Sequence, residues 1–368
     1  MIYIVGFDRD EVLLNRIGDQ ELQYYTNLRH FLPLLEKRAT VVQVDRVDRQ
    51  IDSVYEFARY VGEEVVYLSF SVPSDAYDQL QCRKYVFPDS IPPPVWDQYS
   101  QLAIEQTTAS VVKTSGAVVD STLDGLLPKS EVRYMPWGRS ISASWLALKR
   151  LDFRLALYYL VRRKSVHYYP RQLLLDGVVY TTLIAAERDF DSWKQMIADF
   201  STALSDKADA TLVVKLFGRV NKGVVKKAVR MIKRQTVQCR IVLISEHLPQ
   251  EEYEKLVQAT SFYIPLEAQG KFGKPVLEFM SASKPLIASV NEIKRYADTD
   301  QKILIDCSKN GLGTAFRESY TLYKEESDHY RQMAIAASQD MRAYCSLAVV
   351  EPMLNKWLDT LDAESPRS

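Results

Sequence analysis

The C-terminal half of the chain alternates between short apolar runs and amphipathic stretches of helical length. Two of the apolar runs are VVYTTLI at 178–184 and TLVVKLF at 211–217. The stretch between them, at 190–204, places its large apolar side chains at helical spacing. Continuous apolar strands that alternate with helices are typical of a parallel sheet covered on both faces. With right-handed crossovers, this half is predicted to form a Rossmann-like domain.

The same alternation marks the remaining elements of this half. Further strands are predicted at 240–245, 261–264, 285–288 and 302–306. Helices are predicted to start at Pro249 and near Pro275, because proline suits the first helical turn. Another helix is predicted at 222–235. The apolar face of the helix at 190–204 consists of Trp193, Met196, Ile197, Phe200 and Leu204.

The N-terminal half shows a similar but less regular pattern. Its predicted strands lie at 2–7, 40–44, 64–70, 84–87, 109–114 and 132–135. A helix with a leucine-rich stripe is predicted after the first strand, and Pro33 inside it predicts a kink or an early end. The chain is thus predicted to be α/β, with Rossmann-like domains at 1–172 and 173–342 facing across a cleft. Ligands of such sheets bind beyond the carboxyl ends of the strands, so this cleft is the predicted site.

Composition limits the classes of function. Hydrophobic residues make up 47% and charged residues 26% of the 368 residues, as in a soluble globular protein. A formal net charge of zero predicts no nucleic-acid partner. Four cysteines without metal-binding spacing suit a reducing cytoplasm, and no apolar run approaches the ~20 residues of a membrane-spanning helix. We expect a cytoplasmic protein, or one peripheral to the inner face of the membrane.

The segment at 143–172 interrupts the alternation and is rich in basic and aromatic residues. Between Trp145 and Arg171 it contains seven basic residues against one acid, Asp152. A basic, aromatic, amphipathic stretch can lie on an anionic membrane surface. The alternative is an inter-domain helical hairpin with a solvated basic face. The sequence leaves both interpretations open.

The stretch GKFGKPVLEFMSASKPLIAS at 270–289 combines the features of a ligand-binding helix start. Pro275 suits the first helical turn, and Gly273 allows the backbone to approach a ligand. A helix start offers unpaired N–H groups and a positive dipole end, which favour a phosphate or another anion. Glu278 lies about one turn into this helix, where its carboxylate can hold a pair of hydroxyls. The sequence therefore predicts a binding site at this helix.

The same motif resembles the donor-site helix of retaining GT-B glycosyltransferases of family GT4. The segments at 85–99, 178–216 and 345–359 resemble a subgroup of bacterial O-antigen and capsule polysaccharide glycosyltransferases. The resemblance implies retaining, metal-independent transfer of a hexose from a UDP- or GDP-linked nucleotide sugar to a glycan or lipid-linked acceptor. No separate cofactor is implied. The resembled fold also implies that a helix within 343–368 crosses back to the N-terminal domain.

The resemblance implies roles for five residues at the donor site. Glu278 corresponds to the second glutamate of the family's E-x7-E motif, which binds the ribose hydroxyls. The loop that contains Gly270 and Gly273 would lie near the diphosphate or the sugar. His247, at a predicted strand end, would approach the base, and Gly18, in the loop after the first strand, would approach the donor phosphates.

The sequence departs from the family pattern at two points. The first glutamate of the motif falls on Gly270, and Glu267 would replace it only if the loop follows another path. The arginine and lysine with which the family neutralises the diphosphate leaving group fall on Phe190 and Asp191. Loss of one such cation would cost several kcal/mol of transition-state stabilisation, as does the loss of an oxyanion donor.

Other residues are candidates for the catalytic tasks. Arg188 is the nearest cation in the sequence, and Lys274 and Lys215 are further candidates for contact with the phosphates. Asp89, which follows the strand at 84–87, would position the acceptor. Asp89 is equally suited to cap a helix or turn, and Arg188 to pair with a neighbouring aspartate at the surface.

Two other functions stay open. A degenerate GT-B domain would bind a glycan or a partner protein without catalysis, as the missing glutamate and cations favour. A metal-dependent GT-A transferase would use DRD at 8–10 or DFD at 189–191 as metal ligands. Two Rossmann-like halves do not suit the single domain of that fold.

Overall fold

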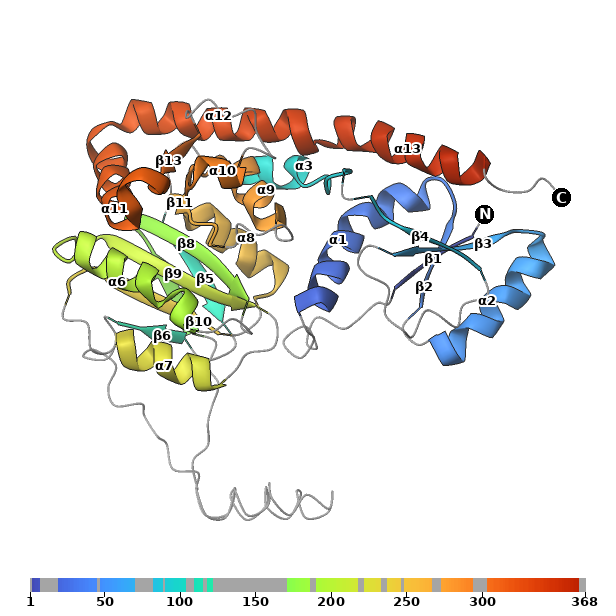
Figure 1. Ribbon diagram of the computed structural model, residues 1–368, viewed down its shortest axis with the longest axis horizontal. Helices are drawn as coiled ribbons and strands as arrows, with labels where there is room; N and C mark the ends of the chain where they lie inside the picture. The colour runs from blue at the N-terminus through green and yellow to red at the C-terminus, as the bar shows by residue number, and fades with distance from the viewer. Residues whose placement is uncertain are drawn as a thin grey trace, which may run out of the picture.

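The computed structural model describes residues 2–6, 19–44, 47–69, 82–88, 90–103, 109–114, 118–121, 171–185, 190–217, 222–232, 237–245, 248–266, 273–293 and 303–363. These residues form two α/β lobes that are joined along one side by two long helices (Figure 1). Each lobe has its own sheet with parallel strands. The predicted α/β class with two Rossmann-like units is therefore confirmed.

The N lobe is built on a four-stranded parallel sheet in the order β2-β1-β3-β4. Its strands are β1 (Ile2–Gly6), β2 (Thr40–Val44), β3 (Val65–Ser69) and β4 (Arg83–Val86). Two helices accompany them, α1 (Asp19–Glu36) and α2 (Val47–Val61). All four strands lie where the sequence predicts them.

Alternate residues of β1 and β3 face opposite sides of this sheet. Tyr3 and Val5 pack in one apolar cluster with Leu35 of α1, whereas Ile2 and Tyr67 pack in another cluster with residues of α2. The two helices therefore cover opposite faces of the sheet. This arrangement leaves α1 on the side of the N lobe that faces the C lobe (Figure 1).

α1 does not end at Pro33, although proline inside a helix costs ~3 kcal/mol. The helix continues to Glu36. Leu34 and Leu35 in its last turn are 4% and 0% exposed. Their burial offsets the cost of the proline, so an early end of the helix is the wrong expectation here.

The C lobe is built on a seven-stranded sheet in the order β13-β12-β11-β8-β9-β10-β6. Its parallel strands are β8 (Val178–Ala185), β9 (Ala210–Phe217), β10 (Arg240–Ile244), β11 (Phe262–Tyr263), β12 (Leu286–Ala288) and β13 (Leu304–Asp306). These six strands confirm the predicted alternation. β6 (Val118–Asp120) pairs with β10 in the antiparallel sense at one edge.

Helices follow the strands of this sheet in the predicted order. They are α6 (Lys194–Ala203), α7 (Lys222–Ile232), α8 (Gln250–Ala259), α9 (Gly273–Ser281) and α10 (Val290–Ile293). The predicted apolar face at 190–204 is buried, and each of its five large side chains is at most 2% exposed. In the core behind it, the centroid of the Tyr180 ring lies 5.5 Å from that of Phe200 and 5.5 Å from that of Phe262.

The predicted strand at 109–114 does not join the N-terminal sheet. β5 (Ser110–Thr114) pairs with β7 (Arg171–Leu175) in a separate antiparallel sheet. β5 pairs there because its apolar face packs on the C lobe, where Val112 belongs to one cluster with Val179, Val242 and Leu256. The chain thus already contributes to the C lobe well before residue 172, the predicted end of the N-terminal domain.

Three helices follow the last strand. α11 (Cys307–Glu325) kinks at Gly311, whose φ of 74° suits glycine. α12 (Ser327–Cys345) packs on α9 and α11 of the C lobe. α13 (Leu347–Ala363) reaches the N lobe, where its buried residues join the core around β1, α1 and Phe87 (Figure 1). Those residues are Val350, Leu354, Leu358 and Leu361.

The described chain passes between the lobes at two places that lie together. One passage runs from β4 to α3 (Trp96–Tyr99), which packs on α9 and α12. The other is Ser346, between α12 and α13. The backbone N–H of Leu347 donates to Oδ2 of Asp97 at 2.5 Å, and Nε1 of Trp96 donates to the carbonyl oxygen of Ser338 at 3.0 Å. These contacts fasten the two passages to each other.

Some sequence predictions fall outside the described residues. These are the strand at 132–135 and nearly all of the basic segment at 143–172. The four cysteines are described, and all are free thiols. Among the described residues, no helix has both the length and the apolar character that crossing a membrane requires.

Lys284, three residues after the end of α9, is a buried lysine of the C lobe. Its residue is 1% exposed, and Nζ donates to the carbonyl oxygen of Gln258 at 3.0 Å. Burial lowers the pKa of Lys284 to about 7. In the unfolded chain the pKa returns to ~10.4, so the unfolded state holds the proton more tightly. As the pH falls from about 10 toward 7, the unfolded chain takes up a proton that folded Lys284 does not, so the free energy of unfolding decreases.

We expect Lys284→Met to abolish this pH dependence. Relative to the variant, wild-type protein should gain about 1.4 kcal/mol in free energy of unfolding for each pH unit between roughly 7.5 and 9.5. Denaturant unfolding of both proteins at pH 7.5 and pH 9.5 measures the change in free energy of unfolding. Lys356→Met, at an exposed site on α13, is the matched control and should keep the wild-type slope. An unchanged slope in Lys284→Met would show that Lys284 stays charged in the folded protein.

Candidate functional site

The predicted ligand-binding helix is present as α9, and it carries one acidic side chain. Glu278 is a charged residue among apolar neighbours on this helix, and it is only 3% exposed. A carboxylate withdrawn from water requires hydrogen-bond or ionic partners. The apolar residues of α9 that pack with α3 and α12 residues in one cluster are Val276, Leu277, Phe279 and Met280.

Both carboxylate oxygens of Glu278 have a partner. The hydroxyl of Tyr253, on α8, donates to Oε2 at 2.7 Å, and Nζ of Lys274 lies 3.3 Å from Oε1. Burial raises the pKa of the Tyr253 hydroxyl well above its ordinary value, and the charge of Glu278 adds to this shift. Burial lowers the pKa of Lys274, although its pairing with Glu278 opposes the shift. The pair thus places a buried carboxylate and a partly buried lysine side chain at the start of α9.

Two residues of α1 approach this pair from the N lobe. Nη1 of Arg29 donates to Oε1 of Gln250, at the start of α8, over 3.4 Å. His30, next to Arg29, is partly buried. Its pKa lies well below the ordinary value, because burial disfavours the imidazolium and because Lys274 and Arg29 repel it. α1 and α9 therefore bring like charges together at the junction of the lobes.

A chain of hydrogen bonds extends from this contact along the C lobe. Nε2 of Gln250 donates to the hydroxyl of Tyr99 at 3.1 Å and to Oε1 of Glu254 at 2.8 Å. Nε2 of Gln98 donates to the same Glu254 oxygen at 2.8 Å. The polar groups of α1, α3, α8 and α9 thus form one group, which we name the junction cluster. Its members are Arg29, His30, Tyr99, Gln250, Tyr253, Lys274 and Glu278.

Lys215 does not belong to this cluster. It lies near the carboxyl end of β9, between β8 and β10 in the sheet. It is 5% exposed. Its Nζ donates to the carbonyl oxygen of Leu216. The position agrees with the edge of the sheet at which ligands bind in open α/β folds, and a role for Lys215 at the phosphates stays a prediction.

The remaining predicted site residues divide into two groups. Gly273, which the sequence placed in the loop before the helix, is the first residue of α9. The others lie outside the described residues, and their roles stay predictions. They are Gly18, Asp89, Arg188, His247, Glu267 and Gly270.

The two positions that depart from the family pattern have structural tasks of their own. Phe190 is 7% exposed, and its ring packs edge-on against Trp193 at a centroid distance of 4.8 Å. Asp191 pairs with Lys194 at 2.5 Å at the surface, and this hydrogen bond lowers the pKa of Asp191. In the part of the chain that the structure describes, no three His, Cys, Asp or Glu side chains gather as metal ligands would.

Sequence reasoning missed five members of the junction cluster, namely Arg29, His30, Tyr99, Gln250 and Tyr253. Arg29 and His30 lie beside the leucine-rich stripe of α1 and leave it intact, so the stripe gave no signal for them. Gln250 and Tyr253 follow the helix start at Pro249 without any distinguishing pattern. Their role arises from the packing of α8 beside α9, which a single sequence does not reveal.

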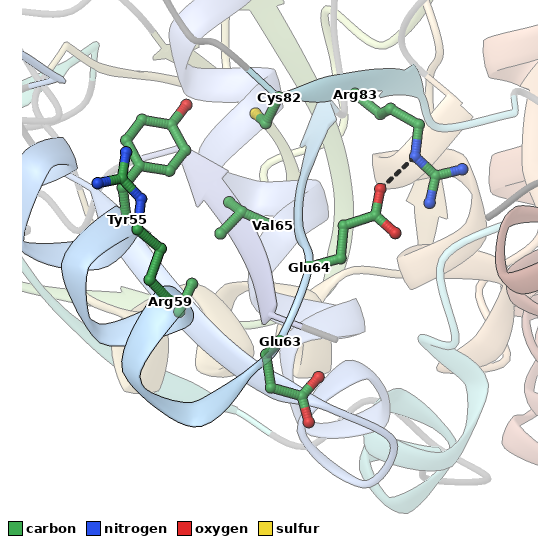
Figure 2. A pocket seen from close by; sticks show the side chains of 8 residues that line it. Tyr55, Arg59, Glu63, Glu64, Val65, Cys82 and Arg83 are labelled. Atoms are coloured by element: carbon green, nitrogen blue, oxygen red, sulfur yellow. Dashed lines mark hydrogen bonds and ion pairs between the residues drawn. The ribbon is translucent and has the colours of Figure 1, made fainter. Parts of the chain in front are cut away.

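A cavity of about 580 Å³ lies in the N lobe, at the amino ends of β3 and β4 (Figure 2). Nε of Arg83 and Oε1 of Glu64 form an ion pair of 2.6 Å on one side of it. Burial raises the pKa of the Cys82 thiol, so this thiol is not activated. The cavity is lined by Tyr55, Ala58, Arg59, Glu63, Glu64, Val65, Cys82 and Arg83. It lies at the opposite strand ends from those that carry ligands in open α/β sheets.

Comparison with known proteins gave matches among solved structures only. No protein-family model matches the chain, and no curated protein does. A glycosyltransferase from Rickettsia africae aligns over 99% of both chains with 10% identity and a TM-score of 0.49.

Two further solved structures align over nearly the whole chain. MnaA from S. aureus, solved with UDP, aligns over 99% of this chain and 98% of its own, with 13% identity and a TM-score of 0.48. HepE from Anabaena, solved with UDP and glucose, aligns over 97% and 99%, with 12% identity and a TM-score of 0.46. At such identities and scores the function of this chain must be argued from its own residues.

Removal of the Tyr253 hydroxyl tests the energetics of the junction cluster. We expect Tyr253→Phe to lower the free energy of unfolding by about 1–3 kcal/mol, because Oε2 of the buried Glu278 loses its donor. Denaturant unfolding measures this change. Tyr60→Phe is the control, since Tyr60 is 89% exposed. Equal stability of the two variants would contradict the hydrogen bond to Glu278.

Proposed function

We propose that this chain is a glycosyltransferase that moves a sugar from a UDP- or GDP-linked nucleotide sugar to a glycan or lipid-linked acceptor in surface polysaccharide synthesis. The observation that carries the proposal is the Lys274–Glu278 pair in the first turns of α9, at the junction of two α/β lobes. The pair offers an acceptor for sugar hydroxyls and a cation for phosphate within one helix start. The resemblance of the α9 motif to family GT4 supports the same assignment.

The bound nucleotide sugar would replace contacts that Lys274 and Glu278 make in the structure. Ribose hydroxyls would donate to the Glu278 oxygens in place of the Tyr253 hydroxyl, which donates to Oε2 in the structure. The displaced Tyr253 hydroxyl would donate to a ribose oxygen instead, because a buried donor without an acceptor costs about 1–3 kcal/mol. Lys274 would turn from Oε1 toward the diphosphate, where the N–H groups at the start of α9 add to its effect.

Transfer breaks the bond between the anomeric carbon of the sugar and the diphosphate oxygen, which keeps the electron pair. The acceptor hydroxyl would form the new bond at the same carbon and pass its proton to the departing diphosphate. Lys274 and the start of α9 would stabilise the charge that develops on the diphosphate. Approach of the two lobes would exclude water, so that hydrolysis does not compete. Retention of configuration and independence from metal belong to the proposal and rest on the resemblance.

A second candidate is a GT-B domain that binds a glycan or partner without catalysis. Glu278 favours it, because this residue is 3% exposed and both of its oxygens already have partners. The departures at Gly270, Phe190 and Asp191 favour it as well. The two candidates differ in nucleotide binding and turnover, which can both be measured.

The proposed acceptor side has two further elements. Asp89 would position the acceptor hydroxyl, and the basic segment at 143–172 would hold the protein at an anionic membrane that carries a lipid-linked acceptor. Both rest on the sequence. An enzyme with such a segment would act at the inner face of the membrane.

Binding of nucleotides tests the assignment of Glu278. We expect UDP or GDP, and the corresponding sugar, to bind wild-type protein in isothermal titration. We expect Glu278→Gln to weaken binding about 10- to 100-fold, because hydrogen bonds to a charged group contribute ~1.5–3 kcal/mol. Glu251→Gln, on an 80% exposed side chain of α8, should bind as wild type does. Turnover of the bound sugar supports the enzyme, and binding without turnover supports the second candidate.

If no nucleotide binds wild-type protein, the nucleotide-sugar function is wrong. If Glu278→Gln binds as tightly as wild type, the assignment of the ribose to α9 is wrong. The melting temperature of each variant is measured beforehand, since loss of the Glu278 charge leaves Lys274 unpaired in a buried site.

Removal of divalent cations tests the proposed mechanism. We expect transferase activity to persist in EDTA, because the helix start and basic side chains would take the place of a metal ion at the diphosphate. The assay compares product formation with and without the chelator. Complete loss of activity that Mg²⁺ or Mn²⁺ restores would favour the metal-dependent GT-A alternative instead.

A further inference from the structure

A second cavity, of about 610 Å³, lies in the C lobe where β13, α11 and the first turns of α12 meet. β13 is the last strand at one end of the seven-stranded sheet, and α11 lies on the side of the C lobe away from the N lobe (Figure 1). α12, with 19 residues, is about 28 Å long, and its other end meets α13 at Ser346. The cavity is therefore separate from the junction cluster.

The cavity has an apolar floor beneath a polar rim. Leu304, Leu322 and Met333 line it and are 4%, 8% and 5% exposed, so they form the floor. An apolar floor with convergent polar groups is typical of a small-molecule site, and the volume lies within the usual range of about 300–1,000 Å³. The exposed polar side chains of the rim are those of Asn310, Arg317, Glu318, Thr321, Glu326 and His329.

The rim presents hydrogen-bond donors and acceptors side by side. The carboxylates of Glu318 and Glu326 accept hydrogen bonds, whereas the guanidinium of Arg317 donates them. The amide of Asn310 and the hydroxyl of Thr321 do both. Within the part of the chain that the structure describes, the side chains of Asn310, Glu318 and Thr321 have neither a hydrogen bond nor an ion pair. These groups are available to a ligand.

The mixture of groups restricts the chemistry of that ligand. An anion would lie beside the carboxylates of Asp306, Glu318 and Glu326, which repel it. A cation would pair with these carboxylates alone, and ion pairs at an exposed rim contribute little. A hydroxyl donates and accepts, so neighbouring hydroxyls of a sugar can donate to a carboxylate while they accept from Arg317. The C–H face of a sugar ring suits the apolar floor.

We propose that the cavity between β13, α11 and α12 binds a carbohydrate, with Glu318 and Glu326 accepting from its hydroxyls and Arg317 donating to them. The leucine and methionine side chains of the floor cover one face of the ring. This site goes beyond the proposed function, because it lies away from the junction of the lobes and does not require a nucleotide.

A carbohydrate site at this place has a use in either candidate function. In a transferase with a glycan acceptor, it would hold one part of the glycan while another part lies at the junction. Such a second contact raises the local concentration of the acceptor. In a GT-B domain without catalysis, the same cavity would itself hold the glycan.

The test titrates the full chain with glucose, galactose, mannose, rhamnose and N-acetylglucosamine, and with disaccharides of these sugars, by ligand-detected NMR. We expect at least one to bind, and Glu318→Ala to weaken it about 10-fold, because a hydroxyl loses a charged acceptor. Thr321→Trp, at an exposed site, should abolish binding, because the indole fills the cavity. Glu325→Ala is the matched control, since Glu325 is exposed on the same helix and does not line the cavity. It should bind within twofold of wild type.

Spermidine, glycine betaine and citrate are titrated alongside as a cation, a zwitterion and an anion. Binding of one of these without binding of any sugar would overturn the carbohydrate assignment, as would binding of no probe. Sugar binding that Glu318→Ala and Thr321→Trp leave unchanged would overturn it as well.

The variant Glu278→Gln separates this site from the junction cluster. If the sugar is lost in Glu278→Gln and retained in Glu318→Ala, it occupies the junction, so this inference fails while the proposed function stands. If Glu318→Ala weakens the sugar but wild-type protein binds no nucleotide, the carbohydrate site stands and the nucleotide-sugar function fails.

Discussion

A carboxylate that is almost removed from water governs the arrangement at the lobe junction. Glu278 stands on a helix whose other side chains are mostly apolar, and its burial requires partners for both oxygens. Those partners fix Tyr253 of α8 and Lys274 of α9 beside it. The positive charge of Lys274 also acts across the junction, where it helps to lower the pKa of His30 on α1. One buried carboxylate thus ties α8 to α9 through Tyr253 and Lys274.

The organisation of the two lobes followed from the sequence because it depends on repeated patterns. Apolar strands alternating with amphipathic helices determined the C-terminal sheet, and the predicted face of α6 is buried. The four strands of the N lobe were also predicted correctly. β5 was assigned to the wrong sheet, because its alternating burial identifies a strand without identifying its partner. Partner choice depended on Val112 meeting the apolar cluster of the C lobe, a contact between distant segments.

The candidate site was predictable only in part. The motif around Pro275 and Glu278 showed a helix start with one carboxylate, and α9 has both. The sequence did not show that Glu278 would be buried, because burial depends on how α3, α8 and α12 pack around α9. It also did not show that Arg29 would contact Gln250 of α8, since the two residues are 221 positions apart in the chain. Local patterns identify a helix and its charges, whereas tertiary packing decides which charges meet.

The fastening of Asp97 to Leu347 has a mechanical consequence for the molecule. Two connections that run side by side act as a pivot, so the easiest relative rotation of the lobes has its axis there. α13, with 17 residues, is a rod about 25 Å long that turns with the N lobe. A small angular change at Ser346 is therefore enlarged at the far end of that lever arm. The same swing would change the distance between α1 and α8, which the hydrogen bond from Arg29 to Gln250 now joins, without repacking either sheet.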